Sequence, residues 1–378
     1  MIPNLSPEIA LLLACGSPPS ESAQARVSGL LAGPIDWPLL VALADSHGML
    51  PLLSRALAGL SSCPVRAEIR ARAAAKAMRS LRLAGELARV LAAMQTAGVT
   101  AIAFKGPALA HLAYGDLALR DFTDLDIFVP RAQLQTALGL LAADGYAKKT
   151  AAWGIGFSGA CEIALQRRDP DCEVDLHWLF SSPYFLPFDP VRAMERSIVI
   201  RAGGLTARTL CPEDHLLYLC IHAAREGWGL LRFPCDIAGL VARCDINWDD
   251  VIREARRTGC WRALAVGLDL AHDLCEAPVP LDVLQPVKQD RAVSRISAQA
   301  RLRIGREVHD PAQAAGGALF HLRMMESPPA KARYMWRRAF QPNQLDAEWI
   351  LLPRRLSAAY YAVRPLRLAC TALRSLVR

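Results

Sequence analysis

The spacing of apolar and polar residues divides the chain into two helical ends and a central part in which strands and helices alternate. Residues 1–95 are rich in Ala, Leu and Arg at helical spacing, most clearly over 65–93, where no proline interrupts the pattern. From Pro212 onward the pattern is helical again, because acidic residues follow that proline in the first turn and an apolar face comes next.

The central part is predicted to be a mixed unit of strands and helices. The pattern indicates a strand over 99–104, a helix over 108–114, a strand over 124–129, a helix over 131–144 and a strand over 173–178. We therefore expect an α+β fold in which a mixed-sheet domain over 96–205 is flanked by a helical N-terminal part (1–95) and a helical C-terminal part (206–378) with a basic tail.

Two aspartates occupy alternate positions of the second predicted strand. Side chains alternate between the faces of a strand, so Asp124 and Asp126 share one face. Leu125, Ile127 and Val129 point to the opposite face, toward a core. Two adjacent carboxylates repel each other unless a cation joins them, and Mg²⁺ prefers oxygen ligands and bridges to phosphate. The alternative is a pair of exposed aspartates at a strand edge.

A third carboxylate lies on the last predicted strand, where Glu173, Asp175 and His177 share a face. If this strand lies beside the two aspartates, Asp175 completes a cluster of the kind that two-metal phosphoryl transfer uses. Asp175 is also suited to accept the proton of the attacking hydroxyl as a general base. For His177 we expect hydrogen bonds that fix it beside the site rather than a place among the metal ligands.

The turn Lys105-Gly106-Pro107 ends the first predicted strand and leads into a helix. The backbone amides of such a turn cradle phosphate oxygens, and Lys105 adds a positive charge. Because Lys-Gly pairs are common, this turn supports a phosphate site only in combination with the carboxylates.

Five short runs stand out together: Phe104-Lys105-Gly106, Tyr114, Arg120, Thr123-Asp124-Leu125-Asp126-Ile127 and Val174-Asp175-Leu176-His177-Trp178. In this order they resemble the bacterial uncharacterised nucleotidyltransferase family, which belongs to the DNA polymerase β-like nucleotidyltransferase superfamily. A similar but looser likeness extends over 210–245, where His222, Trp228, Arg232 and Asp236 occur. The resemblance predicts that the central sheet domain is of the nucleotidyltransferase type.

The resemblance implies that a nucleoside triphosphate and Mg²⁺ bind at Asp124, Asp126 and Asp175. Lys105 and Gly106 correspond to the turn on the phosphate side. We expect transfer of a nucleoside monophosphate from a triphosphate, with ATP as the first candidate, to an acceptor that is a protein, a peptide, a sugar or a small molecule. The alternative is a catalytically inactive nucleotide-binding or scaffold protein of the same fold.

Two further nucleotide-binding residues are expected from the same resemblance. Arg120 contacts the phosphates or the acceptor. Asp236 either reaches the nucleotide across the cleft or pairs with Arg232 one turn earlier. The chain departs from the family at Pro107, where Ala is usual; proline removes one amide donor but suits the first helical position.

Composition and charge restrict the partners. The pattern contains no apolar run long enough to span a membrane and no N-terminal secretory signal, and the eleven cysteines form no CxxC pair, so we expect a cytoplasmic protein. The net charge of +8 is concentrated in an Arg-rich tail without acidic residues after Leu351. One alternative is that this tail binds nucleic acid, an anionic membrane surface or an acidic partner. The other is that it forms the solvated face of a terminal helix.

Two other signals are set aside. The run 154–159 matches the GxGxxG pattern, but its flanks are not a strand and a helix, so we expect a loop near the site rather than a dinucleotide site. His215 and His222 lie seven residues apart on one predicted helix, and we expect core or interface histidines rather than metal ligands.

Overall fold

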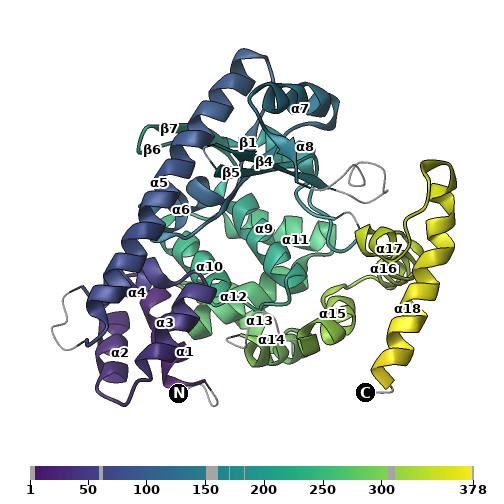
Figure 1. Cartoon of the computed structure of the whole chain (residues 1–378). Coiled ribbons are helices and arrows are strands. Elements are labelled where there is room, and N and C mark those ends of the chain that lie inside the picture. The colour runs from purple at the N-terminus through teal and green to yellow at the C-terminus, as the bar shows by residue number, and fades with distance from the viewer. Residues whose placement is uncertain are drawn as a thin grey trace.

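The computed structural model describes residues 5–58, 63–149, 161–169, 171–182, 184–304 and 311–376. Helices form both ends, and a mixed sheet lies between them (Figure 1), so the predicted α+β fold is confirmed. The helices before the sheet are α1 (Pro7–Gly16), α2 (Glu21–Leu31), α3 (Trp37–Ser46), α4 (Leu50–Ala56) and the long α5 (Arg66–Thr96).

The central elements alternate as the sequence predicts, with additional short ones. They are β1 (Ile102–Ala103), α6 (Gly106–Tyr114), η1 (Leu117–Leu119), β2 (Asp124–Phe128), η2 (Arg131–Gln133), α7 (Leu134–Ala143), β3 (Ala147–Lys148), β4 (Glu162–Arg168), β5 (Asp171–His177), α8 (Pro190–Glu195), β6 (Ile198–Ala202) and β7 (Leu205–Thr209).

Helices form the rest of the chain. They are α9 (Pro212–Arg225), α10 (Arg232–Arg243), α11 (Trp248–Thr258), α12 (Trp261–Cys275), α13 (Leu281–Gln289), α14 (Arg291–Arg303), α15 (Pro311–Met324), α16 (Pro328–Phe340), α17 (Gln344–Trp349), η3 (Arg354–Ala359) and α18 (Tyr360–Leu376). No helix in the described ranges is both long enough and apolar enough to cross a membrane.

The five-stranded sheet has the order β1-β2-β5-β4-β3. Its two inner neighbours β2 and β5 run parallel, and every other pair is antiparallel. The register pairs Asp124 with Glu173 and Asp126 with Asp175. In-register residues on neighbouring strands point to the same face, so this pairing brings the aspartates of two distant segments together.

The two faces of the sheet have different roles. Leu125 and Ile127 of β2 pack with apolar side chains of α5 and α7, which form one core. The opposite face carries Asp124, Asp126 and Phe128. Phe128 stacks on Phe180 at 4.3 Å between ring centroids and joins the larger helical core that contains α9, α10 and α12. The alternation predicted for the second strand is therefore confirmed.

Helix α10 approaches α6 closely because residue 239 is glycine. A Cβ at Gly239 would lie 2.6 Å from the carbonyl oxygen of Ala113, a distance that side chains do not tolerate. Arg232 and Phe233, at the start of α10, line the same cavity as Asp124 and Asp126 of the sheet.

Some elements differ from the sequence prediction for local reasons. The first strand is only two residues long, because the amide of Thr100 donates to the side chain of Gln133 instead of joining the ladder. The helix predicted over 131–144 begins as a 3₁₀ turn, with the α-helix starting at Leu134. The hairpin β6–β7 was not predicted, although its Gly203-Gly204 turn is a known hairpin signal.

Candidate active site

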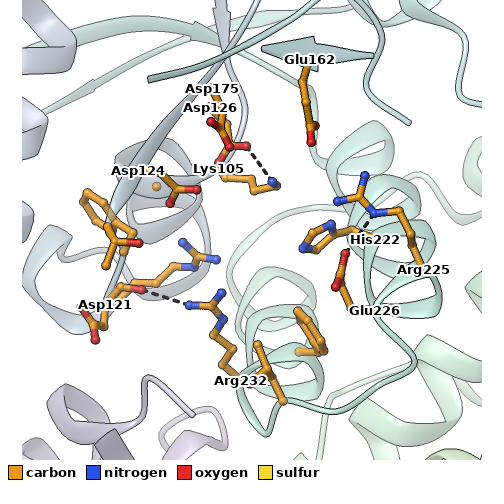
Figure 2. A pocket seen from close by; sticks show the side chains of 16 residues that line it. Lys105, Asp121, Asp124, Asp126, Glu162, Asp175, His222, Arg225, Glu226 and Arg232 are labelled. Atoms are coloured by element: carbon orange, nitrogen blue, oxygen red, sulfur yellow. Dashed lines mark hydrogen bonds and ion pairs between the residues drawn. The ribbon is translucent and has the colours of Figure 1, made fainter. Parts of the chain in front are cut away.

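A cavity of about 310 Å³ lies between the charged face of the sheet and the helices α9 and α10. Figure 2 shows acidic side chains on the sheet side and basic side chains facing them from the helices. The sheet side contributes Asp124, Asp126, Glu162 and Asp175, the connecting turns contribute Lys105, Gly106, Arg120 and Asp121, and the helical side contributes His222, Arg225, Glu226 and Arg232.

The carboxylates of β2 and β5 form the centre of the acidic side. Asp126, Asp175 and His177 each offer one ligand atom, and these three atoms lie within 4.8 Å of one another. Asp124, two residues before Asp126 on β2, lines the same cavity but lies outside this closest group. The structure therefore brings the three predicted carboxylates to one cavity and adds His177 as a neighbouring donor.

Asp126 is buried between two donors. Lys105 Nζ donates to its Oδ1 over 2.7 Å, and His177 Nε2 lies 3.1 Å from the same oxygen. Burial alone raises the pKa of Asp126, but Lys105 and His177 outweigh burial and hold that pKa well below its usual range. For Lys105, burial alone would lower the pKa of the ammonium group. The charge of Asp126 outweighs burial, so the pKa of Lys105 is raised above its usual value. This pair is ionised at every ordinary pH.

Asp175 has no such compensation. Its Oδ1 is buried without a hydrogen-bond partner among the described residues. Burial, and then the charges of Asp126 and Asp124, raise the pKa of Asp175 to about 7. Burial and Asp126 also raise the pKa of Asp124. The cluster thus holds more negative charge than Lys105 offsets, which is the electrostatic condition that favours a divalent cation.

His177 is fixed beside the cluster, as expected from the sequence. Its Nε2 bonds to Asp126, and its ring meets the Phe104 ring edge-on at 5.0 Å between centroids. Its Nδ1 lies 3.1 Å from Glu162 Oε2 without hydrogen-bond geometry.

Arg120 and Asp236 form a buried ion pair at the back of the cavity. Arg120 Nε lies 3.2 Å from both carboxylate oxygens of Asp236, and Nη2 lies 3.1 Å from Oδ2. The Tyr114 hydroxyl donates to Oδ1 of the same aspartate over 2.8 Å. Asp236 does not line the cavity, whereas Arg120 does. Of the two alternatives for Asp236, pairing with Arg232 is not found among the described residues, because Arg120 occupies that carboxylate. Contact of Asp236 with the nucleotide stays a prediction, although Asp236 does not line the cavity.

Two arginines on the helical wall were not among the predicted site residues. Arg232 lines the cavity, and no carboxylate oxygen in the described ranges lies within ion-pair distance of it; its Nη1 donates only to the Asp121 carbonyl at 3.4 Å. Burial, and then the charge of Arg120, lower the pKa of Arg232. Arg225 stands at the end of α9 and donates to its exposed neighbour Glu226. Of these two arginines, only Arg232 could have been found from the sequence, because it lies in the looser part of the family likeness over 210–245.

Comparison with known families identifies the chain. Residues 33–276 match the model of a family described as uncharacterised nucleotidyltransferase. The chain belongs to this family. The match contains the whole five-stranded sheet and every residue that lines the cavity.

The other comparisons add little to this assignment. No curated protein matches the chain. One similar solved structure is the crystal structure of an antigenic nucleotidyltransferase-like protein from Paracoccidioides brasiliensis, with 14% sequence identity and a TM-score of 0.34. That likeness covers 55% of this chain and 96% of the other.

The turn before α6 differs from the expected phosphate cradle of a nucleotidyltransferase. The Lys105 side chain contacts the carboxylates, and its carbonyl accepts from the amides of Ala108 and Leu109. Pro107 stands in the first turn of α6, where it offers no amide. Gly106 lines the cavity. Phosphate binding at this turn stays a prediction.

The two histidines of α9 have different surroundings. His215 is buried, with Nε2 2.5 Å from the Phe104 carbonyl oxygen, and burial lowers its pKa to about 4, so the expectation of a core histidine is confirmed. His222 lines the cavity, so it is a residue of the cavity wall rather than of the core. The GxGxxG run over 154–159 lies outside the described residues.

Proposed function

We propose that this nucleotidyltransferase moves a nucleoside monophosphate from a nucleoside triphosphate to an acceptor, with Mg²⁺ held by Asp124, Asp126 and Asp175. The observation that carries the proposal is the parallel register of β2 and β5, which sets Asp126 beside Asp175 in a cavity walled by arginines. Acidic ligands for a metal and basic ligands for phosphate thus face each other across a space of about 310 Å³.

The residues present fit a divalent cation. The buried, unbonded Oδ1 of Asp175 and the raised pKa values of Asp175 and Asp124 indicate that a cation would relieve the cluster. Oxygen donors of this type suit Mg²⁺. When bound, the metal would polarise the phosphate and stabilise the charge that develops during transfer.

The arginines supply the nucleotide side of the site. Asp236, which also accepts from the Tyr114 hydroxyl, holds Arg120, so Arg120 presents a fixed guanidinium at the cavity wall. Arg232 lacks an acidic partner among the described residues, and a triphosphate would provide one. We assign both to the polyphosphate. In our assignment Asp236 acts through Arg120 and does not touch the nucleotide.

Asp175 has a second role in this scheme, besides holding the metal. In this scheme the Asp175 carboxylate accepts the proton that the acceptor hydroxyl loses as it attacks the α-phosphate. The bond between the α- and β-phosphates breaks, and pyrophosphate leaves with its electron pair.

We propose ATP as the donor and a protein, peptide, sugar or small molecule as the acceptor, with nucleic acid as a less supported class. The eleven free thiols suit a reducing compartment, and we place the reaction in the cytoplasm.

A second function is favoured by one observation. The Lys105 ammonium already bonds to Asp126 Oδ1, an oxygen that a metal would use. If this ion pair persists with nucleotide bound, the protein binds a triphosphate without transferring it.

The deciding experiment supplies ATP labelled at either the α- or the γ-phosphate, together with Mg²⁺ and a cell extract as the source of acceptor. Label transferred from the α-position alone, and lost in Asp126→Asn, supports nucleotidyl transfer. Label from the γ-position alone identifies a phosphotransferase instead. Nucleotide binding without transfer from either position supports the non-catalytic function.

A further inference from the structure

The net positive charge of the molecule comes from its C-terminal end. Residues 327–378 contain ten Lys and Arg and two Asp and Glu, so they carry the entire net charge of +8, and residues 1–326 have a net charge of zero. This end lies beyond the region that matches the family model. Figure 1 shows α18 at the side of the molecule, next to α16 and α17 and away from the sheet.

Exposed apolar side chains gather in the same end. Ten of the eighteen large hydrophobic residues that are exposed in the described ranges fall within 335–366. Leu351 has the highest exposed fraction among them, 77%, and follows directly after the exposed Trp349 and Ile350. Exposed apolar groups scattered singly are ordinary, whereas a concentration of this kind indicates a surface that becomes covered.

The segment that carries Leu351 is held with its side chains outward. The hydroxyl of the fully buried Tyr360 donates to the Ile350 carbonyl and accepts from the Leu352 amide, over 3.0 and 2.9 Å. The backbone is therefore pinned to α18 while the side chains of 349–351 face solvent. Arg355 and Leu356, both exposed, come shortly afterwards.

The two acidic residues of this end differ in exposure, because Glu348 is exposed and Asp346 is not. Asp346 is completely buried and accepts from Arg367 over 2.6 Å, with Arg364 Nη1 3.5 Å from its other oxygen. Arg333, Arg338 and Arg355 are exposed. The surface therefore combines several arginines with tryptophan, leucine and isoleucine, and with one exposed carboxylate, that of Glu348.

We propose that this surface, comprising α16, residues 349–356 and the exposed side of α18, docks on an anionic membrane. Anionic lipid headgroups complement the arginines, and the apolar side chains of 349–351 enter the boundary between headgroups and acyl chains. Tryptophan is suited to that boundary. Aliphatic side chains such as Ile350 and Leu351 favour hydrocarbon over nucleic acid, which takes up arginine and aromatic rings but offers no apolar interior.

The proposal is independent of nucleotidyl transfer, and its test uses the full chain with vesicles. We expect co-flotation with vesicles that contain phosphatidylglycerol, little with pure phosphatidylcholine vesicles, and release as salt is raised. Leu351→Glu and Trp336→Glu should each weaken binding about tenfold, because each removes an exposed apolar side chain that the membrane would cover and adds a charge that anionic lipid repels.

Matched controls come from the neutral body of the protein. Leu281 and Met78 are 73% and 69% exposed, against 77% for Leu351 and 66% for Trp336. Leu281→Glu and Met78→Glu should leave vesicle binding unchanged. Thermal unfolding of all four variants checks that the fold is kept.

Three results would overturn the proposal. One is vesicle binding that does not respond to Leu351→Glu. Another is binding of duplex DNA or RNA that Arg355→Gln abolishes while vesicles fail to bind. The third is a dimer in sedimentation equilibrium that Leu351→Glu dissociates, since a second copy would then cover this surface.

Discussion

Asp236 on α10 accepts hydrogen bonds from Arg120, which lies 116 residues earlier in the chain and beside the central sheet. This ion pair ties the helical C-terminal part to the turn that precedes the acidic strand. Both side chains are buried, and Tyr114 supplies a further hydrogen bond to Asp236. The contact fixes one wall of the cavity relative to the other.

Replacing Asp236 should therefore destabilise the protein strongly. Asp236→Ala leaves Arg120 buried without its partner, and we expect the free energy of unfolding to fall by about 3–5 kcal/mol. Tyr114→Phe removes one neutral donor and should cost about 1 kcal/mol. Urea denaturation measures both, and equal effects of the two variants would contradict the assignment of the ion pair as the main contact.

Neutralising Asp126 and Asp175 should change stability in opposite directions when a chelator removes divalent cations. Asp126→Asn breaks a buried pair with Lys105 and should lower the free energy of unfolding by about 3 kcal/mol. Asp175→Asn removes a carboxylate whose folded-state pKa of about 7 exceeds its unfolded value. At pH 8 the ionised Asp175 destabilises the fold, so Asp175→Asn should raise stability by about 2 kcal/mol.

The sign follows from proton binding. Between pH 4 and 7 the folded protein holds the Asp175 proton more tightly than the unfolded chain, so stability falls as pH rises through this window. Below about pH 4 both forms are protonated, and the stability difference between wild type and Asp175→Asn should disappear. Both substitutions should abolish transfer; an active Asp126→Asn variant would remove Asp126 from the site.

His215 should make the fold sensitive to acid. Its folded-state pKa is lowered to about 4 by burial, so the unfolded chain binds the proton more readily. The stability contributed by the neutral ring is fully present above pH 6.5 and is lost as pH falls through 4, by about 3 kcal/mol. In His215→Gln the decline in unfolding free energy between pH 7 and 4 should be shallower by that amount, as followed by denaturant titrations at each pH.

Arg232 should matter for the nucleotide and not for the fold. Because burial and Arg120 disfavour its charge, Arg232→Gln should leave the unfolding free energy unchanged or raise it. Loss of a charged donor to phosphate should weaken triphosphate binding by about 2 kcal/mol, roughly thirtyfold in Kd. Calorimetric titration with ATP measures this, and Arg257→Gln, on the outer side of α11 with Glu254 as its partner, serves as a control of equal charge change.

Gly239 should tolerate no larger side chain. In Gly239→Ala the new Cβ would meet the Ala113 carbonyl, so α10 must move away from α6. We expect a loss of about 1–3 kcal/mol in stability together with weaker nucleotide binding, because α10 carries Arg232. Gly85→Ala, at a helical glycine with open space around it, should instead be neutral or stabilising, which melting curves of the two variants will compare.

The sequence predicted those parts of the site that depend on local periodicity. Asp124 and Asp126 share a face because strands alternate, and that holds whatever surrounds the strand. The pairing of Asp126 with Asp175 was foreseen only as a condition, since the register of parallel strands is set by long-range packing. The partner of Asp236 was missed for the same reason: Arg120 and Arg232 are both arginines near it, and only the approach of α10 to α6 selects Arg120.

The domain boundaries at 95 and 205 remain predictions. Helix α5 ends at Thr96, and its C-terminal half packs against the sheet that follows it. Its buried residues Leu87 and Val90 therefore belong to the same core as those of β2. Periodicity locates the ends of helices but cannot assign a helix to one core or another.

The parallel pairing of β2 and β5 has a consequence for the proposed metal site. Each of these strands is hydrogen-bonded to a neighbour on both sides, so their backbones cannot separate to relieve the repulsion between Asp126 and Asp175. The mutual repulsion is released only when a cation or a proton arrives. Amide exchange at the middle of the sheet should therefore slow on metal binding, so that the central strands report occupancy of the site.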